Sequence, residues 1–319
     1  MTADECVANA MDNGLRDVVE QLEVERQVIL HGNRTVMQWV AGITAAAVGW
    51  EYYRQMPWWA YLVTGMIGAL LCWAICGGRK GKAGSRFKEV AIPELLKHTL
   101  PDFRYFGGCC IGEDDFCDSG LYMAPDRYNG QDYFDGQVGA TALRFSLVHA
   151  QERYETIVTD TDSDGHTTTH TEEHWRDIFK GLFVVADFNK HFSGCTLVRA
   201  GKAGVLSGWN SSLVKLEDPR FTKKFTVYSN DQIEARYLLT PNMMERLVEL
   251  HNIIGGFEAS FRNSSIYIAA GGFPYGAFNP DVRLPCTDQQ QLSRILGWIF
   301  TVGNIVEDLD LNTRIWTKQ

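Results

Sequence analysis

The sequence predicts an α+β fold: an N-terminal transmembrane helical hairpin followed by a cytoplasmic domain with an antiparallel sheet and packed helices. Two uncharged stretches near the N-terminus, residues 35–50 and 55–78, predict the hairpin. Alternating runs of β-forming residues beyond Pro101 predict the sheet, and apolar stretches that begin with capping residues predict the helices.

The N-terminal segment, residues 1–34, is predicted to lie in the cytoplasm and to contain an amphipathic helix over residues 12–31. Four apolar residues fall near one stripe of that helix: Leu15, Val18, Leu22 and Ile29. Because the segment is acidic and polar, it lacks the character of a cleaved signal peptide.

The hairpin is predicted over residues 35–78. Its second stretch, residues 55–78, is 24 residues long, and at ~1.5 Å per residue it can cross a hydrocarbon core of ~30 Å. The first stretch has 16 residues, so it requires local thinning of the bilayer. Small residues at four-residue spacing, Gly42 with Ala46 and Gly65 with Ala69, are expected to let the two helices approach closely.

Aromatic residues mark both ends of the predicted hairpin. Five of the nine tryptophans lie there: Trp39, Trp50, Trp58, Trp59 and Trp73. The middle three cluster at the hairpin tip and the outer two lie near the opposite ends, which is typical of anchors at two membrane interfaces. A hairpin buried in a soluble core is the alternative, but such a hairpin rarely has its aromatic residues only at its two ends.

Basic residues predict the orientation. Five follow the second span, in a glycine-rich linker that leads to a short helix ending near residue 100: Arg79, Lys80, Lys82, Arg86 and Lys88. The tip carries only Arg54, so the positive-inside rule places both termini in the cytoplasm. We expect the five residues of this linker, residues 79–100, to contact the inner leaflet.

Strands are predicted through most of the cytoplasmic domain, residues 101–319. Residues 132–158 alternate and are rich in β-formers, and the DSDG turn at 162–165 pairs residues 152–161 with residues 166–188 as a hairpin. Further strands are expected at 195–199, 212–216 and 224–229, and residues 257–270 form a second hairpin that turns at Asn263-Ser264.

Three helices are predicted among these strands from their start signals. Ser229 with Gln232 and Thr287 with Gln290 have the spacing of capping boxes, and Thr240 followed by Pro241 is a strong helix start. The last helix has a broad apolar face that begins at Leu292.

Composition limits the classes of partner. The net charge of -9 argues against nucleic acid as a partner, because phosphate binding needs a basic surface. The eight cysteines are expected to be thiols, since the cytosol is reducing.

Three strings in the second half of the chain resemble domain-of-unknown-function family 3137: residues 178–198, 213–250 and 311–318. The resemblance extends over nearly the whole chain. It implies a multi-pass protein of the bacterial inner (plasma) membrane with a cytoplasmic α+β domain, and it implies no reaction. Residues 109–120, which contain a double cysteine, depart from the family's usual pattern.

Partners follow from the same resemblance. Family members are often encoded beside LemA-type membrane proteins, which implies a membrane protein of that type as partner, together with the lipid bilayer itself.

Histidines and cysteines are the candidate metal ligands. His166, His170 and His174 would share one face of a helix, but the β-branched residues between them favour a strand. On a strand, residues four apart are roughly 13 Å from one another, too far to share a metal. The cysteine spacing at 109, 110 and 117 matches no zinc ribbon. We therefore expect no metal and no cofactor.

The family-like strings contain six charged candidates for catalysis: Asp187, Glu217, Asp218, Asp231, Glu234 and Arg236. They could converge on a ligand. The alternative is structural: the aspartates end a strand, make a turn and cap a helix, and Arg236 pairs with a carboxylate of LEDP or with Asp231 inside the fold.

Three functions remain open. An interaction or scaffold protein of the inner membrane fits the pattern best, because the sequence contains no GxSxG, Walker, HExxH or dinucleotide motif. A membrane-tethered hydrolase or transferase that uses the carboxylates and Arg236 is the first alternative. A lipid-headgroup-binding module that uses the basic linker is the second.

Overall fold

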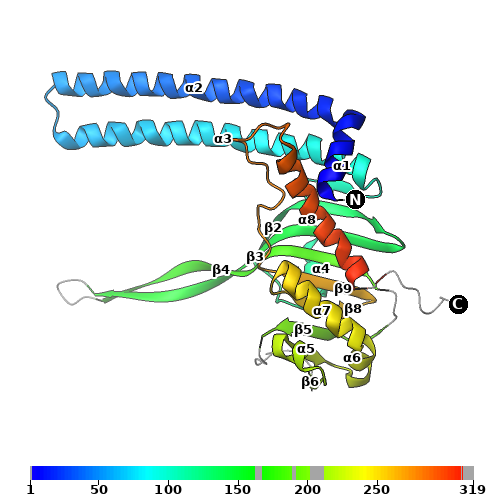
Figure 1. The fold of residues 1–319 in the computed structure, drawn as a ribbon. Helices are drawn as coiled ribbons and strands as arrows, with labels where there is room; N and C mark the ends of the chain where they lie inside the picture. Colours follow the sequence, from blue (N-terminus) through cyan, green and yellow to red (C-terminus); the bar gives the residue numbers. More distant parts are fainter. Residues whose placement is uncertain (1, 162–166, 189–191, 202–211, 310, 312–319) are drawn as a thin grey trace. The chain divides into compact units, whose positions relative to one another are not determined.

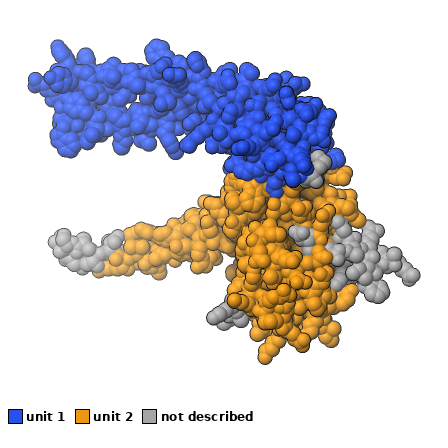
Figure 2. All heavy atoms as spheres, viewed as in Figure 1, with its two compact units in different colours: residues 1–101, 278–297 blue, residues 102–277, 298–319 orange. Residues whose placement is uncertain are grey.

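The computed structural model describes residues 2–161, 167–188, 192–201, 212–309 and 311. The chain forms two compact units, which Figure 2 colours separately. Unit 1 comprises residues 1–101 and 278–297, and unit 2 comprises residues 102–277 and 298–319. Residues 278–297 therefore pack with the N-terminal helices, although the sequence assigned them to the C-terminal domain.

Unit 1 is built on helices α1 (Ala3–Ala10), α2 (Arg16–Tyr53) and α3 (Trp58–Thr99), with a short π-helical turn, η1 (Met11–Leu15), between the first two. A capping box starts α1: Thr2 accepts from the amide of Glu5, whose carboxylate accepts from the amide of Thr2 at 2.8 Å. The chain bends at Gly14, where φ is 119°. Of the predicted helix over residues 12–31, residues 12–15 thus belong to η1, and residues 16–31 are the start of a helix of 38 residues that continues into the first apolar stretch.

Helix α3 replaces the predicted linker. It continues without interruption through the glycine-rich basic stretch and through Pro93 to Thr99. Each interior glycine costs a helix about 1 kcal/mol. Burial of Phe87, Ala91 and Leu95 on the following turns offsets that cost.

Helices α2 and α3 lie side by side and antiparallel (Figure 1). Their close approach occurs where a Cβ on Gly68 would collide with the hydroxyl of Thr44. It does not occur at the predicted Gly42 and Gly65, where a Cβ would have no described atom within 4 Å. Among the described helices, α3 alone is long and apolar enough to cross a membrane, which leaves the first span of the predicted hairpin, residues 35–50, unconfirmed.

Unit 2 contains an antiparallel sheet, as predicted. In its described part the strand order is β1-β2-β3-β4-β9-β8-β5-β7-β6, and all neighbours are antiparallel. The nine described strands are β1 (Arg104–Phe106), β2 (Arg127–Val138), β3 (Thr141–Thr161), β4 (Thr167–Asp187), β5 (Thr196–Ala200), β6 (Ser212–Val214), β7 (Phe225–Ser229), β8 (Glu258–Arg262) and β9 (Ser265–Ala270).

Both predicted hairpins are present. Strands β3 and β4 pair from Leu143 opposite Ala186 out to Thr161 opposite Thr167, while the predicted turn at 162–165 lies outside the described residues. Strands β8 and β9 turn at Asn263 and Ser264, both with positive φ. Two positive φ values in succession give the turn a twist that matches that of the strands.

Helices α4 (Glu113–Asp118), α5 (Pro219–Lys224), α6 (Gln232–Leu238) and α7 (Pro241–Ile254) belong to unit 2, and α8 (Gln289–Asp308) begins in unit 1 and ends in unit 2. As predicted, Thr240 caps α7 and Pro241 takes its first position. The other two starts use aspartates in place of the predicted Ser229 and Thr287: Asp231 caps α6, and Asp288 accepts from the amide of Gln290 at 2.9 Å.

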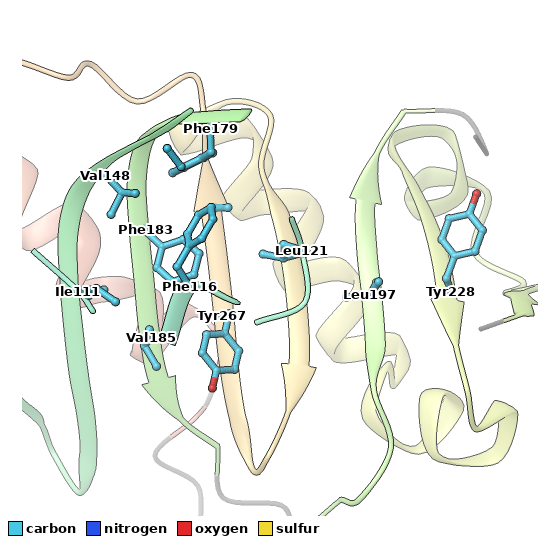
Figure 3. Packing of buried hydrophobic residues seen from close by; sticks show 12 residues of the cluster. Ile111, Phe116, Leu121, Val148, Phe179, Phe183, Val185, Leu197, Tyr228 and Tyr267 are labelled. Carbon is cyan, nitrogen blue, oxygen red and sulfur yellow. The ribbon is translucent and has the colours of Figure 1, made fainter. Parts of the chain in front are cut away.

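The core lies on both faces of the sheet. On one face, Phe116 of α4 packs against Phe183 of β4, with ring centroids 5.2 Å apart, and beside Tyr267 of β9 (Figure 3). On the opposite face, Ile266 and Ile268 are equally buried. Successive residues of β9 point to opposite faces, so the sheet is covered on both.

Candidate functional site

An open cleft of about 700 Å³ in unit 2 is the candidate site. Three of its lining residues come from the six charged candidates predicted from the sequence: Glu217, Asp218 and Arg236. The other lining residues are Lys215, Leu216, Pro219, Arg220, Pro241 and Met244.

The turn into α5 holds the acidic wall of the cleft. Asp218 caps α5 by accepting from the amides of Arg220 at 2.7 Å and Phe221 at 3.3 Å, and Pro219 takes the first helical position. This cap leaves Glu217 exposed immediately before the helix. A carboxylate that forms no hydrogen bond or ion pair with the described residues therefore lines the cleft.

Arg236 forms the basic wall, and the prediction of a buried ion pair for it is wrong. The side chain is exposed, and its guanidinium donates to the carbonyl oxygens of Gln232 at 2.8 Å and Lys215 at 3.5 Å. Within the described residues, no carboxylate lies within ion-pair distance of it. The reason is local: Ala235 and Leu238 form the buried face of α6, so Arg236 points away from the core.

The remaining three candidates lie elsewhere in unit 2 and do not line the cleft. Asp231 is the α6 cap, Asp187 ends β4 at the surface, and Glu234 accepts from the amides of Ser193 at 2.9 Å and Gly194 at 2.7 Å. Asp187 and Asp231 have the roles that the structural alternative gave them, whereas the contacts of Glu234 were not predicted.

Two basic residues of the cleft were missed by the sequence analysis. Lys215 and Arg220 flank the LEDP string, residues 216–219. Their place next to Glu217 and Asp218 in the sequence was the signal that could have predicted them as lining residues. Arg220 lies 3.4 Å from Glu245 and 3.9 Å from Asp218, whereas Lys215 and Arg236 have no carboxylate partner in the described part of the chain. The cleft can therefore bind an anion through these two cations, with Glu217 beside it as a possible base.

The predicted histidine strand is confirmed for the residues described. His170 and His174 lie on β4 with Glu172 between them, at 3.2 and 3.5 Å from its two oxygens. His166 lies outside the described residues. No group of three metal-ligating side chains comes together in the ranges that the structure describes.

The cysteines near residue 110 are surrounded by apolar and acidic groups. Cys109 is exposed, and burial raises the pKa of the Cys110 and Cys117 thiols, helped at Cys117 by nearby carboxylates. A raised pKa favours the thiol over the thiolate that zinc requires. The expectation of no metal remains a prediction.

Of the five basic residues expected at the inner leaflet, four are exposed on α3: Arg79, Lys80, Lys82 and Arg86. The fifth, Lys88, is buried and donates to the side-chain oxygen of Asn279 at 2.9 Å. Its predicted role at the membrane surface is therefore wrong, because helix α3 turns this position toward the core of unit 1.

Strands β3 and β4 form an arm that extends beyond the sheet (Figure 1). Within the described residues, β2 pairs with β3 no further than Gln151, and β9 pairs with β4 only from Leu182 onward. Past these points the two strands pair with each other alone. The arm exposes Tyr154, Trp175 and Ile157, the last of which is 71% exposed.

The comparison with family models supports the resemblance predicted from the sequence. Residues 177–311 match the model of the family described as "Protein of unknown function (DUF3137)", a shorter part of the chain than expected. The crystal structure of the mycobacterial trehalose monomycolate transport factor A, TtfA, is similar with a TM-score of 0.35 and 10% identity, and covers 72% of this chain and 96% of that chain. No curated protein matches.

Proposed function

We propose that the chain is anchored in a bacterial inner membrane and uses unit 2 to bind a partner protein in the cytoplasm. The observation that carries this proposal is the apolar surface of α2 and α3 between residues 35 and 78. Large side chains there are exposed on several sides, among them Trp39, Ile43, Leu70 and Trp73. Soluble proteins rarely expose an apolar surface of this extent, whereas lipid tails would cover it.

Both helices would cross the membrane together. Although α2 is the less apolar of the two, it packs along α3, and Trp50, Trp58 and Trp59 are exposed near the tip. Trp39 and Trp73 are exposed near the other ends. This distribution supports anchoring at two interfaces.

The exposed cations support an orientation with both termini in the cytoplasm. Arg79, Lys80, Lys82 and Arg86 follow the apolar part of α3, against Arg54 alone at the tip. Cytoplasmic loops carry the excess of Lys and Arg.

The β3–β4 arm is the proposed docking element of unit 2. Within the described residues, no strand pairs with the outer edge of β3 beyond Gln151 or of β4 before Leu182, and an extended segment of a partner could add a strand there. The exposed Tyr154 and Ile157 would supply side-chain contacts beside that strand. The resemblance makes a membrane protein of the LemA type the partner to test first.

A photocrosslinking amino acid at Ile157 tests the docking proposal in native membranes. Ile253 on α7 is the matched control, since it is an equally apolar, exposed residue away from the arm. We expect one membrane protein to be captured from position 157 and not from position 253. Capture of the same proteins from both positions, or of none from position 157, would count against the arm.

A hydrolase or transferase is the second candidate, favoured by the cleft that holds Glu217 and Arg236. Turnover of phosphate and carboxylate esters by the full chain would support it, provided that Glu217→Gln and Arg236→Ala both abolish that turnover. Glu249→Gln, an exposed change on α7, is the control. Turnover that survives both cleft variants would rule out this site.

A further inference from the structure

Unit 1 contains a cavity of about 600 Å³ that neither the predicted site nor the docking arm uses. It lies between α2, α3 and residues 280–286. Its apolar walls are Leu22 and Ile29 from α2, Phe87 from α3, and Val282 and Leu284 from that segment. This volume and this lining are typical of a site for a small molecule.

A shielded ion pair holds one end of residues 280–286, the segment that lines the cavity together with α2 and α3. Arg26 donates to both oxygens of Glu23, at 2.6 and 2.8 Å, and also to the carbonyl oxygen of Val282 at 3.1 Å. Glu23 in turn accepts from the amide of Cys286 at 2.8 Å. The two charged side chains are only 11% and 15% exposed. The pair therefore fixes residues 282–286 beside α2.

A second set of contacts holds the other end. The amide of Asp281 donates to the side-chain oxygen of Gln291, which is buried, at 2.6 Å. Lys88 donates to Asn279 at 2.9 Å. Braced at both ends, the segment keeps an apolar space open, and an apolar ligand would stabilise that space by displacing water from it.

The remaining wall is charged with both signs. Lys82, Arg86 and Glu89 lie four and three residues apart on α3, so they share one stripe of the helix. Glu25 of α2 faces that stripe, 3.7 Å from Arg86, and more than half of each of these two side chains is exposed. Cations and carboxylates at the mouth of an apolar cavity match a ligand that has an acyl chain, a phosphate and an amine.

We propose that this cavity binds one amine-bearing phospholipid. Its phosphate would contact Lys82 and Arg86, its amine would contact Glu25 and Glu89, and an acyl chain would occupy the apolar walls. Gly78, the last residue of the uncharged stretch, also lines the cavity, so a lipid of the inner leaflet lies within reach. The inference rests on the proposed membrane anchor for its source of lipid.

Calorimetric titration tests the proposal with the full chain held in amphipol and with monomeric dihexanoyl phosphatidylethanolamine as the probe. The variant with both Lys82→Glu and Arg86→Glu should bind at least about tenfold more weakly, since two charge-assisted contacts are reversed. The control carries Arg79→Glu and Lys80→Glu, the same charge change on the same helix outside the cavity. Equal weakening in both variants would overturn the proposal.

Two further measurements keep the outcome unambiguous. Ser85→Trp, at an exposed position that lines the cavity, should abolish binding without loss of helicity by circular dichroism. Dihexanoyl phosphatidylglycerol, which lacks the amine, should bind several-fold more weakly than the amine-bearing probe. Equal affinity for the two lipids, or binding that survives Ser85→Trp, would contradict the assignment. Because a monomeric lipid needs no bilayer, failure of the anchor would instead appear as release of the chain from membranes by alkaline carbonate.

Discussion

At the scale of single residues, Glu234 and Arg236 show how differently two neighbours in one short helix can be used. Glu234 accepts hydrogen bonds from two backbone amides of the segment before β5. Arg236 is exposed, and within the described residues it donates to the backbone carbonyl oxygens of Gln232 and Lys215 and to the side-chain oxygen of Gln232. Removing Glu234 would leave two amides without their acceptor. Removing Arg236 would leave carbonyl groups that water can reach.

We therefore expect the two alanine variants to lose stability by different amounts. Glu234→Ala should lower the free energy of unfolding by about 1–3 kcal/mol, and Arg236→Ala by less than about 1 kcal/mol. Thermal unfolding of the full chain in detergent, followed by near-ultraviolet circular dichroism, measures both. If Arg236→Ala proved as costly as Glu234→Ala, the guanidinium would have a structural partner after all.

The thiols near residue 110 carry a prediction about metal. The spacing of Cys109, Cys110 and Cys117 matches no zinc ribbon, and no group of three metal-ligating side chains comes together among the described residues. Elemental analysis of the purified full chain should find far less than one zinc per chain. One equivalent of zinc that disappears in a Cys117→Ser variant would contradict this expectation.

At the scale of elements, the brace between α2 and residues 282–286 should depend on pH. Hydrogen bonds from Arg26 lower the pKa of Glu23 to about 2 from its ordinary 4.5. A lowered pKa means that the carboxylate stabilises the fold fully above pH 4.5 and loses this contribution as the pH falls from there toward 2.

The difference in melting temperature between the wild type and Glu23→Gln should report this brace. We expect a constant difference between about pH 6 and 8, which shrinks below pH 4.5. Asp17→Asn, which removes a carboxylate from the first turn of the same helix outside the brace, is the control for the loss of one negative charge. A difference in melting temperature that grew on acidification would contradict a stabilising role of the ionised Glu23 carboxylate.

The packing of α2 against α3 makes a second prediction at this scale. Gly68 faces Thr44 too closely for a side chain, whereas Gly65 has open space beside it. Gly68→Ile should destabilise the hairpin by about 1–3 kcal/mol through overpacking. Gly65→Ile, the same change on the same helix, should be nearly neutral in the same thermal assay, and equal effects would place the helix contact elsewhere.

At the scale of the whole molecule, the proposed topology can be measured directly. Alkaline phosphatase, which needs the oxidising periplasm to form its disulfides, should be inactive when fused after Lys88 and active when inserted at Gln55. The physical reason is the excess of basic residues after the apolar part of α3, against Arg54 alone at the tip. Phosphatase activity from the fusion after Lys88 would exclude a cytoplasmic unit 2.

Local patterns were enough to predict many elements of this chain. The uncharged stretches became the helices of unit 1, Asn263-Ser264 became the turn of a hairpin, and Thr240 with Pro241 started a helix. Each of these features depends on residues close together in the sequence, through backbone preference, capping or hydrophobic periodicity.

Tertiary structure decided the features that depend on distant residues. Glu23 binds the amide of Cys286, 263 positions away, and this contact draws residues 278–297 into unit 1 and creates its cavity. The exposure of Arg236 likewise follows from which face of α6 is buried. No local pattern encodes such contacts, because they depend on how complete elements pack. The sequence by itself therefore determined the kinds of element, and packing determined which charged side chains face a cleft.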